Sequence, residues 1–449
     1  MTPTRPMTAS AQPAAAVTTY AWYVVGVLTL CYTLSYIDRQ ILNTFVGPIR
    51  AEFSISDAQF GLLQGLGFAI FYTLVGLPLG RVVDQASRRN LIVVGIMIWS
   101  LFTAVCAMAG SYNMLFIGRI GVGVGEATLG PAAFSILADY FPRERLGLAA
   151  NIFYVGQLLG ASLALIIGGV VREAVAGQIT VPILGAIAGW RFVFLLLGIP
   201  GMIFAMLVFT VREPARSSVL RRADGGADRP GIAQSLSQIR ERWQSIAGVS
   251  LAFAFQAACN YGFMAWAVEH FLRTHHWQPG QTTRALGFLI ITCGGGGLYV
   301  GGLLCNRLQK RGVVDAPLLV SIPSAIGILV FMPAAMLAGT PELALTLAAP
   351  GLFFLALPMG AAGASLQHIV PNQLRGQVSA LYLFILNIGG LPIGSYVPGY
   401  LTTNVFKSDQ MLGAAVAITI GVCATLMLVL ILATRRPYRR HYEMMRAQA

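Results

Sequence analysis

Four ionisable residues lie inside long apolar stretches of the sequence. Asp38 and Arg39 are adjacent in the first stretch, and Arg119 and Glu126 lie seven residues apart in the fourth. If these stretches are helices, Arg119 and Glu126 project from one face, two turns apart, whereas Asp38 and Arg39 point about 100° apart. Each charge costs roughly 2.5–3.5 kcal/mol at the centre of a bilayer. We therefore expect all four to face a protein interior or a water-filled route through the membrane.

The two carboxylates are candidates for proton binding, and the two arginines for charge compensation. Burial favours the protonated form of a carboxyl and a nearby guanidinium favours the ionised form, so protonation of Glu126 would depend on whether Arg119 or Arg39 is engaged. We interpret Glu126 as the proton carrier and Asp38 as a second titrating group, with the proton as coupling ion. Arg39 or Arg119 would hold an anionic head group, because a guanidinium is a permanent charge with a bidentate fork.

Alternatives remain open for these residues. Because Asp38 and Arg39 cannot serve the same helix face, we expect one of them to pair with the fourth stretch and the other to line a cavity. A permanent ion pair that locks the first and fourth stretches together would explain Glu126 without proton transfer. An entirely internal network of four charges would explain Asp38 in the same way.

The composition indicates a membrane protein. Of the 449 residues, 56% are hydrophobic and only 10% are charged, against about 25% charged in soluble domains. The six cysteines are scattered, with no CxxC pair or Cys/His cluster, so we expect neither a metal site nor a disulfide framework, and no cofactor besides the proton. Residues 1–19 lack the features of a signal peptide.

Apolar stretches of spanning length predict twelve membrane-crossing helices, six on each side of a charged linker. We expect a cytoplasmic N-terminal segment at 1–19, an N-terminal six-helix bundle at 20–211, a cytoplasmic linker at 212–244, a C-terminal bundle at 245–434 and a basic cytoplasmic tail at 435–449. The predicted crossings are Tyr20–Val46, Ala58–Leu79, Asn90–Ala109, Met114–Ala138, Gly147–Val171, Trp190–Val211, Ser245–Phe271, Thr283–Leu304, Ala316–Leu337, Leu343–His368, Gln377–Leu401 and Met411–Thr434.

The distribution of Lys and Arg predicts the orientation. With both termini cytoplasmic, the inner segments hold 22 of the 30 Lys and Arg residues, the outer loops hold six, and Arg39 and Arg119 lie within helices. Positive residues concentrate on the cytoplasmic side of membrane proteins. The net charge of +13 then reflects topology and attraction to anionic membrane lipids, without a nucleic-acid partner. We expect a monomer in a bacterial inner membrane.

The two halves of the sequence echo each other. Gly80, Asp84, Arg88 and Arg89 follow the second stretch, and Gly302, Asn306, Lys310 and Arg311 follow the eighth in the same register, 222 residues later. A duplicated six-helix unit is therefore expected, with a substrate site between the halves near mid-membrane.

At these residues the chain resembles the major facilitator superfamily. The loop from Gly80 to Arg89 matches its signature between the second and third helices, and Arg212-Glu-Pro214 resembles its usual exit from helix six. The segments Tyr36–Leu42, Arg119–Ala127 and Asp139–Pro142 are similar to the spinster-like branch. The resemblance implies two pseudo-symmetric bundles around a central cavity, an amphipathic lysophospholipid- or sphingolipid-like substrate, and proton coupling.

The resemblance also implies a cytoplasmic gate. Asp84, Arg88 and Arg89, with Asp139 at the inner end of helix four, would form a charge latch that parts when the inner side opens. A plain positive-inside loop would explain the arginines alone, but not Asp84 or the repeated glycine spacing.

Four polar residues within apolar spans are possible cavity contacts: Tyr154, Asn260, Tyr261 and Asn387. Such residues more often make a hydrogen bond between helices than a ligand contact, and helix phase alone does not distinguish the two. The C-terminal half carries almost no mid-membrane charge, which favours an apolar wall opposite the charged residues.

We therefore expect a secondary transporter that works by alternating access and is not an enzyme, since no nucleophile–base or metal constellation lies within the spans. Transport of small organic anions or drugs is the main alternative, although polar residues are sparse in helices seven, ten and eleven. A channel or lipid scramblase is a remoter one, because it would need no repeated gate loops.

Overall fold

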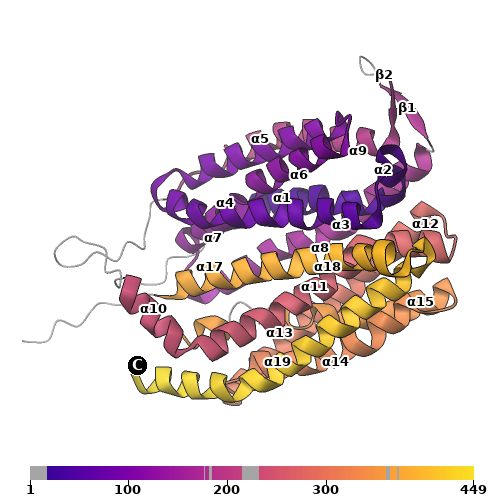
Figure 1. Ribbon diagram of the computed structural model, residues 1–449. Coiled ribbons are helices and arrows are strands. Elements are labelled where there is room, and N and C mark those ends of the chain that lie inside the picture. The colour runs from indigo at the N-terminus through magenta and orange to yellow at the C-terminus, as the bar shows by residue number, and fades with distance from the viewer. Residues whose placement is uncertain are drawn as a thin grey trace, which may run out of the picture.

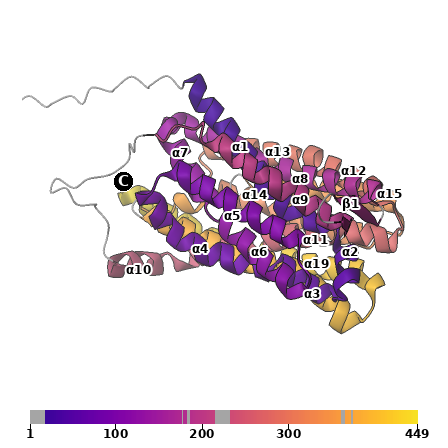
Figure 2. The ribbon, with the colours of Figure 1, turned by 90° about the horizontal axis from the view of Figure 1, so that it is seen from above.

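The computed structural model describes residues 18–175, 177–181, 185–214, 232–359, 365–371 and 374–448. Long helices run side by side in two layers, with the N-terminal half of the chain drawn above the C-terminal half (Figure 1). Viewed from above, the first layer lies over the second (Figure 2). A short strand hairpin lies at one end of the molecule, and the linker helix and the end of the last helix lie at the other. We call these the hairpin end and the tail end.

The N-terminal half consists of apolar helices with serine caps at several starts. Ser56 begins a helix with a capping box completed by Gln59, and Ser87 and Ser111 each accept a hydrogen bond from the first turn that follows, which satisfies free backbone N–H groups. The elements are α1 (Thr19–Ile41), η1 (Leu42–Thr44), α2 (Val46–Phe53), α3 (Asp57–Gln64), α4 (Leu66–Gln85), α5 (Arg88–Ala107), α6 (Tyr112–Glu126), α7 (Leu129–Tyr140), α8 (Arg143–Ala174), β1 (Gln178–Val181), β2 (Gly185–Ala188) and α9 (Gly189–Val208).

The C-terminal half begins with a helix from the linker and repeats the long crossings. Two of its crossings contain a widened π-helical turn beside glycines, at Ile290–Gly294 and Leu386–Gly390. The elements are α10 (Ile232–Glu241), α11 (Trp243–Thr274), α12 (Pro279–Leu289), η2 (Ile290–Gly294), α13 (Gly295–Lys310), α14 (Ala316–Met336), α15 (Pro341–Ala356), α17 (Arg375–Ile385), η4 (Leu386–Gly390), α18 (Leu391–Tyr400), η5 (Leu401–Phe406), η6 (Asp409–Met411) and α19 (Leu412–Gln448).

The crossings agree with the twelve predicted from the sequence. Among the described residues, eleven helices are long and apolar enough to cross a membrane, and the predicted tenth crossing, Leu343–His368, contains the shorter 16-residue α15. An all-α membrane fold with two six-helix halves is therefore confirmed.

Three predicted crossings of the N-terminal half are interrupted. The fourth, Met114–Ala138, is divided directly after Glu126 into α6 and α7. The first, Tyr20–Val46, ends as a helix at Ile41, and α2 starts after a 3₁₀ turn. The second, Ala58–Leu79, is divided at Gly65 into α3 and α4. Gly65 packs against the other half so closely that a Cβ there would lie 3.1 Å from the Cα of Pro392. The pattern of apolar residues along the chain carries no information about such a contact between distant segments.

Two further features differ from the predicted element boundaries. Between the fifth and sixth crossings, β1 and β2 pair antiparallel, with Gln178 opposite Ala188 and Val181 opposite Gly185. The last helix continues beyond Thr434, the predicted end of the last crossing, to Gln448. This tail is rich in arginine, a good helix former, and it packs on other helices as described below.

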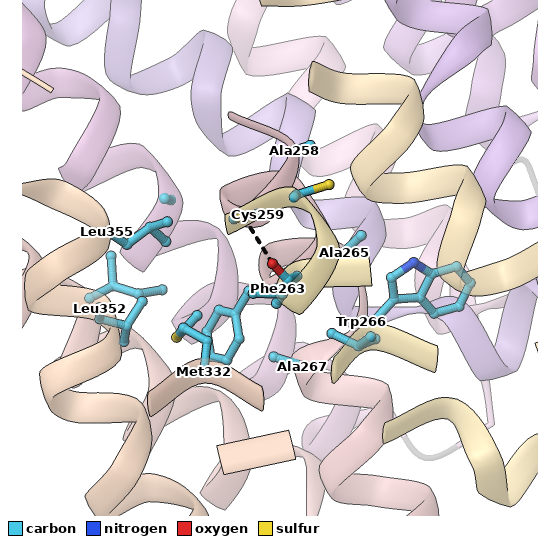
Figure 3. Packing of buried hydrophobic residues seen from close by; sticks show 14 of the residues in the cluster. Ala258, Cys259, Phe263, Ala265, Trp266, Ala267, Met332, Leu352 and Leu355 are labelled. Carbon is cyan, nitrogen blue, oxygen red and sulfur yellow. Dashed lines mark hydrogen bonds between the residues drawn. The ribbon is translucent and has the colours of Figure 1, made fainter. Parts of the chain in front are cut away.

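The core explains how the two halves meet. Buried apolar residues of both halves form one continuous cluster towards the hairpin end, where Phe60 of α3 packs edge-on against Trp266 of α11 at 5.9 Å. Within the C-terminal half, Phe263 of α11 lies beside Met332 of α14 and Leu352 of α15 (Figure 3). Glycines let the halves approach: a Cβ on Gly61 would lie 2.5 Å from the backbone oxygen of Ser395.

Candidate functional site

The four predicted charges come together between α1 and the fourth crossing. The Arg39 guanidinium contacts Glu126 Oε2 through Nη2 at 2.5 Å and Nε at 3.1 Å. Ser35, one turn before Arg39, donates to the same oxygen at 2.8 Å. All three side chains are buried, so Glu126 is held by a fork of charge-assisted hydrogen bonds inside the helix bundle.

Asp38 pairs with the other arginine. Arg119 Nη1 lies 3.7 Å from Asp38 Oδ1 and donates to the Asp38 backbone oxygen at 3.4 Å. Thr103 of α5 donates to Asp38 Oδ2. The expectation that only one of Asp38 and Arg39 pairs with the fourth crossing is therefore wrong. Both pairs form because the long arginine side chains span the two helical turns, about 10 Å, that separate Arg119 from Glu126.

Polar atoms in this charge cluster remain without hydrogen-bond partners. Asp38 Oδ1, Glu126 Oε1, and Nε and Nη2 of Arg119 are buried and make no hydrogen bond within the protein, although Asp38 Oδ1 lies 3.7 Å from Arg119 Nη1. Buried polar groups are normally paired, and a buried charge with incomplete partners costs several kcal/mol. The cluster is thus not a fully satisfied structural network in this conformation.

Arg39 lies in an aromatic cage. Its guanidinium carbon is 4.4 Å from the ring centre of Phe68, 4.9 Å from that of Tyr36 and 5.1 Å from that of Tyr72. Its side chain is 8% exposed, more than the other three charges of the cluster. Ring faces attract a cation, so the cage stabilises the guanidinium without neutralising it.

A row of rings leads away from this cage. Tyr36 packs on Tyr32 at 5.2 Å, and Tyr32 lies 6.2 Å from Tyr154 of α8. Tyr154 also contacts Phe134 of α7 at 5.4 Å. Tyr154 is 43% exposed despite these contacts, so part of its side chain is not covered by protein.

The other predicted contacts differ in their surroundings. Tyr261 of α11 is buried and packs into the apolar cluster of the N-terminal half, within electrostatic range of Arg39. Asn260 is only partly buried. Asn387 lies within the π-helical turn and donates to the backbone oxygen of Leu383, one turn earlier, at 2.8 Å. It therefore makes a local bond rather than the interhelical one considered from the sequence.

The tail end of the N-terminal half carries a clamp around Arg88. Its Nε contacts Glu213 at 2.7 Å, its Nη1 contacts Asp139, and its Nη2 donates to the Pro214 backbone oxygen at 2.8 Å. We call this group the Arg88 clamp. It holds the start of α5 against the end of α7 and against the segment that follows α9. The proximity of Arg88 to Asp139 matches the predicted latch.

The other members of the predicted latch are placed differently. The Arg89 side chain does not contact Asp139: its Nε donates to Asn90 at 3.1 Å and its guanidinium lies 5.7 Å from Phe209. The side chain of Asp84 lies outside the described part of the structure. Glu213 was missed from the sequence, although it stands in the segment Arg212–Pro214 that carried the resemblance.

Hydrogen bonds keep Glu213 ionised. Burial opposes its charge, but donation from the Arg89 backbone N–H, Arg88 and Ser87 outweighs burial and holds the pKa of the carboxyl below its usual range. The Arg88 clamp therefore carries full charge at neutral pH.

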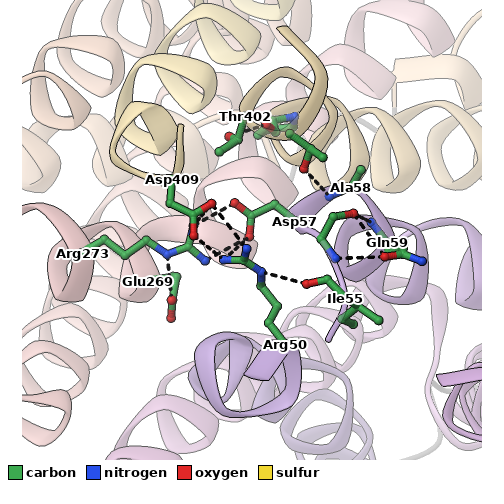
Figure 4. Close-up of polar contacts among 12 residues, drawn as sticks. Arg50, Ile55, Asp57, Ala58, Gln59, Glu269, Arg273, Thr402 and Asp409 are labelled. Atoms are coloured by element: carbon green, nitrogen blue, oxygen red, sulfur yellow. Dashed lines mark hydrogen bonds and ion pairs between the residues drawn. The ribbon is translucent and has the colours of Figure 1, made fainter. Parts of the chain in front are cut away.

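A second group of charges joins the two halves at the hairpin end (Figure 4). Asp57 of α3 accepts from Arg273 of α11 at 2.7 and 2.9 Å, and lies 3.0 Å from Arg50 of α2. Arg50 also binds Asp409 at 3.0 Å, and Arg273 binds Glu269 at 2.8 Å. We call these five residues the hairpin-end cluster. Its pairing across the two halves could not be predicted from the sequence, because Asp57 and Arg273, and likewise Arg50 and Asp409, lie far apart along the chain.

The contacts between the halves show which side is closed. Asp57 to Arg273, Ser162 of α8 to the Gly287 backbone oxygen at 3.1 Å, and Glu173 to Arg284 at 3.1 Å all cross between the halves towards the hairpin end. Among the described residues, each tail-end ion pair stays within one half. The protein is therefore held closed at its hairpin end.

The described residues contain no group of three or more His, Cys, Asp or Glu side chains arranged to hold a metal ion. The charged groups that lie deep in the fold are instead paired acids and arginines, which suit proton and anion binding.

Comparison with known proteins identifies the family. The Major Facilitator Superfamily model matches residues 28–394. An MFS-type efflux pump of Mycolicibacterium smegmatis is 27% identical over 416 residues, covering 89% of each chain. Protein spinster homolog 1 of Homo sapiens is 28% identical over 318 residues, which are 68% of this chain and 58% of that one.

A solved structure supports the same assignment. A bacterial homolog of the human lysosomal transporter spinster, in an inward-facing and unoccupied conformation, superposes with a TM-score of 0.71 at 25% identity, over 95% of this chain and 97% of that one. These relatives are transporters, in agreement with the expectation that the chain is not an enzyme. The chain is similar to spinster proteins, and it is a multi-pass membrane transporter of the major facilitator superfamily.

Proposed function

We propose that this protein is a proton-coupled transporter that moves an amphipathic, lipid-like substrate by alternating access. The observation that carries the proposal is the charge cluster of Asp38, Arg39, Arg119 and Glu126, buried but incompletely paired. Each buried polar atom without a hydrogen bond destabilises the fold, so these side chains gain stability when they bind a further partner. Incomplete hydrogen bonding of these charges suits a site whose side chains change partners during a transport cycle.

Protonation of Glu126 would release Arg39. The neutral acid would keep the hydrogen bond from Ser35, but its attraction for the guanidinium, now 2.5 Å away, would be lost. Arg39 would then be free to bind an anionic head group, while the rings of Tyr36, Phe68 and Tyr72 keep its charge tolerable in the membrane. Asp38 and Arg119 form the parallel pair, with Asp38 as the second proton site.

The lipid-like substrate class is supported by the surroundings of Arg39. A permanent cation suits a phosphate or carboxylate head group, and the row from Tyr36 to Tyr154 offers apolar faces to a hydrocarbon chain. A second candidate is a small organic anion or drug-like molecule, as the efflux-pump relative suggests. The hydroxyls of Tyr32, Tyr36 and Tyr154 favour it, because they could bind polar groups that a hydrocarbon chain lacks.

We place the tail end on the cytoplasmic side, following the positive-inside rule, and the protein as a monomer in a bacterial inner membrane. In this orientation the closed hairpin end faces outward, so the described conformation is inward-facing. The Arg88 clamp, with Asp84, would then act at the cytoplasmic gate, and the hairpin-end cluster at the outer one.

Transport in proteoliposomes tests the proposal. Uptake of a lysophospholipid and of a panel of small organic anions is measured with and without a pH gradient. We expect the lysophospholipid to be transported, and Glu126→Gln to abolish acceleration by the gradient while counterflow exchange persists, because a glutamine cannot release a proton.

Glu52→Gln is the matched control, since Glu52 pairs with Arg191 near the hairpin end, outside the charge cluster. It should retain the gradient dependence. Gradient-driven uptake that is unchanged in Glu126→Gln would refute the proton assignment, and transport of organic anions alone would refute the lipid-like substrate.

A further inference from the structure

The last helix does more than cross the membrane: its tail packs along the tail end of the C-terminal half. We call Arg435–Met445 the tail segment. Tyr438 is fully buried and donates to the Ser365 backbone oxygen at 2.8 Å. His441 is buried and bonds Ser245 of α11 at 2.7 Å. A solvated basic tail would bury neither ring.

A buried acid anchors the tail segment. Asp315, immediately before α14, is fully buried. Its two oxygens face Arg435 Nε at 2.8 Å and Arg439 Nη2 at 3.0 Å. Burial alone would disfavour the charge, but the hydrogen bond from Arg435 and the ion pair with Arg439 outweigh burial and hold the pKa of the Asp315 carboxyl below its usual range. The pair therefore stays ionised at neutral pH.

The arrangement mirrors the Arg88 clamp with the charges reversed. In the N-terminal half, a buried base at the start of the third crossing binds acids at the ends of the fourth and sixth crossings. In the C-terminal half, a buried acid at the start of the ninth crossing binds bases at the end of the twelfth. Both halves also have a hydrogen bond to the segment that ends the next crossing. In the N-terminal half, Arg88 donates to the Ser135 backbone oxygen at 3.2 Å. In the C-terminal half, Tyr438 of the tail segment donates to the Ser365 backbone oxygen.

Internal duplication explains where the second group of charges lies, but not why its acid and its bases have exchanged places relative to the Arg88 clamp. The register of 222 residues that relates Arg88 to Lys310 also relates Glu213 to Arg435. A direct copy of the N-terminal clamp would therefore place two bases together. Asp315, five residues beyond Lys310, supplies the opposite charge and keeps the clamp attractive.

We propose that Asp315, Arg435 and Arg439 form a second clamp, in which Asp315 is a positioning residue that holds the tail end of the C-terminal half as one body during transport. This inference rests on the proposed alternating-access function and extends it to the tail segment, which the sequence indicated only as a basic cytoplasmic tail.

The second clamp predicts a specific effect on the cycle. The tail end can close only if each half keeps its shape where the two halves meet. Removing contacts of the second clamp therefore slows closure without altering the distant substrate site. Turnover should fall while KM stays unchanged. Because closure is impaired, the interior should also be open to the tail end for a larger fraction of time.

The test compares graded variants in the full chain. Arg439, 48% exposed, is replaced first, because Arg439→Gln leaves Asp315 bound to Arg435 and should still fold. Arg435→Gln/Arg439→Gln and Asp315→Asn remove the clamp. Arg435→Lys/Arg439→Lys keeps the charges. The control is Arg436→Gln/Arg440→Gln, since both residues are exposed on the same tail.

Two readouts are measured in each variant. The first is turnover and KM for the transported lysophospholipid. The second needs no substrate: labelling of Tyr154→Cys by a membrane-impermeant maleimide applied from the tail end, with Cys293→Ser to remove the one native cysteine that is not buried. We expect turnover to fall roughly threefold to tenfold in Arg439→Gln and further in the double variant, with unchanged KM and faster labelling.

The lysine pair should restore both readouts, and the control should match the parent. An increase in KM at unchanged turnover, or turnover and labelling in the clamp variants equal to those of the control, would overturn the second clamp. If the parent transports none of the probes, the proposed function fails, but the labelling comparison still decides the clamp.

Discussion

Replacing Asp57 with asparagine removes the central negative charge of the hairpin-end cluster and should open that end of the protein. Asp57 is buried and receives Arg273 at 2.7 and 2.9 Å and Arg50 at 3.0 Å. The contact with Arg273 exists only while the two halves touch at the hairpin end. Its loss therefore destabilises the closed state relative to the open one, rather than the fold as a whole.

The size of the effect follows from which partners remain. Breaking a buried ion pair costs about 3–5 kcal/mol when the surviving charge is left alone. Here Arg273 still contacts Glu269 at 2.8 Å and Arg50 still contacts Asp409 at 3.0 Å, so each arginine retains an acidic partner. We therefore expect a loss of about 2–3 kcal/mol, which shifts the closed–open equilibrium by roughly 30- to 150-fold.

Cysteine labelling at the interface measures this shift. Ala58 is buried, and its backbone N–H donates across the halves to Thr403 at 3.2 Å, so Ala58→Cys should be protected in the parent and accessible in Asp57→Asn. The matched control is Glu173→Gln, which removes another hairpin-end ion pair between the halves. That pair is well exposed, with side-chain exposures of 36% and 56%, and should contribute less than about 1 kcal/mol.

Labelling of Ala58→Cys should therefore accelerate strongly with Asp57→Asn and by less than about fivefold with Glu173→Gln. Equal labelling rates in the two variants would refute the argument that burial, and not merely crossing between the halves, decides which ion pair holds the hairpin end closed.

Two other predictions concern the same closed state and the Arg88 clamp. Gly61→Ala would place a Cβ 2.5 Å from the Ser395 backbone oxygen, so it should also increase labelling of Ala58→Cys. Gly110→Ala is the control, because a Cβ there has no atom within 4 Å, and it should leave labelling unchanged. Unchanged labelling in Gly61→Ala would show that the two halves do not approach so closely. The pKa of Glu213 is held low by the Arg89 N–H, Arg88 and Ser87 against the effect of burial, so its contribution to stability is complete above its unfolded pKa of about 4.3 and is lost as the pH falls through its lower folded value. Thermal unfolding in detergent should accordingly show the parent losing its advantage over Glu213→Gln only below about pH 4, and an advantage lost between pH 6 and 8 would contradict this.

Much of the site could be anticipated because membranes make charge conspicuous. Asp38, Arg39, Arg119 and Glu126 stand out in apolar stretches, and the structure brings all four together. Their partners were less predictable: which arginine binds which acid depends on how far the side chains reach between α1 and α6. Helix phase ruled out a shared partner face for Asp38 and Arg39, but it carries no information on reach.

Residues at helix ends were harder to interpret from the sequence. Arg50 and Arg273 were only counted among the positive residues of the outer loops, and the tail arginines were interpreted as a topology signal. The sequence predicted no role for Asp57 or Asp315. In the structure each has a partner more than a hundred residues away, and Arg50, Asp57 and Arg273 also pair with a residue close to them in the sequence.

The sequence by itself determined the twelve crossings, the duplication and the position of the buried charges, because burial in lipid demands long apolar helices and makes every exception to that rule visible. The tertiary structure decided the pairing of those charges, the division of the second crossing at Gly65, and which end of the molecule is closed. These depend on contacts between segments distant in the chain, whose distances and packing are set only when the two halves come together.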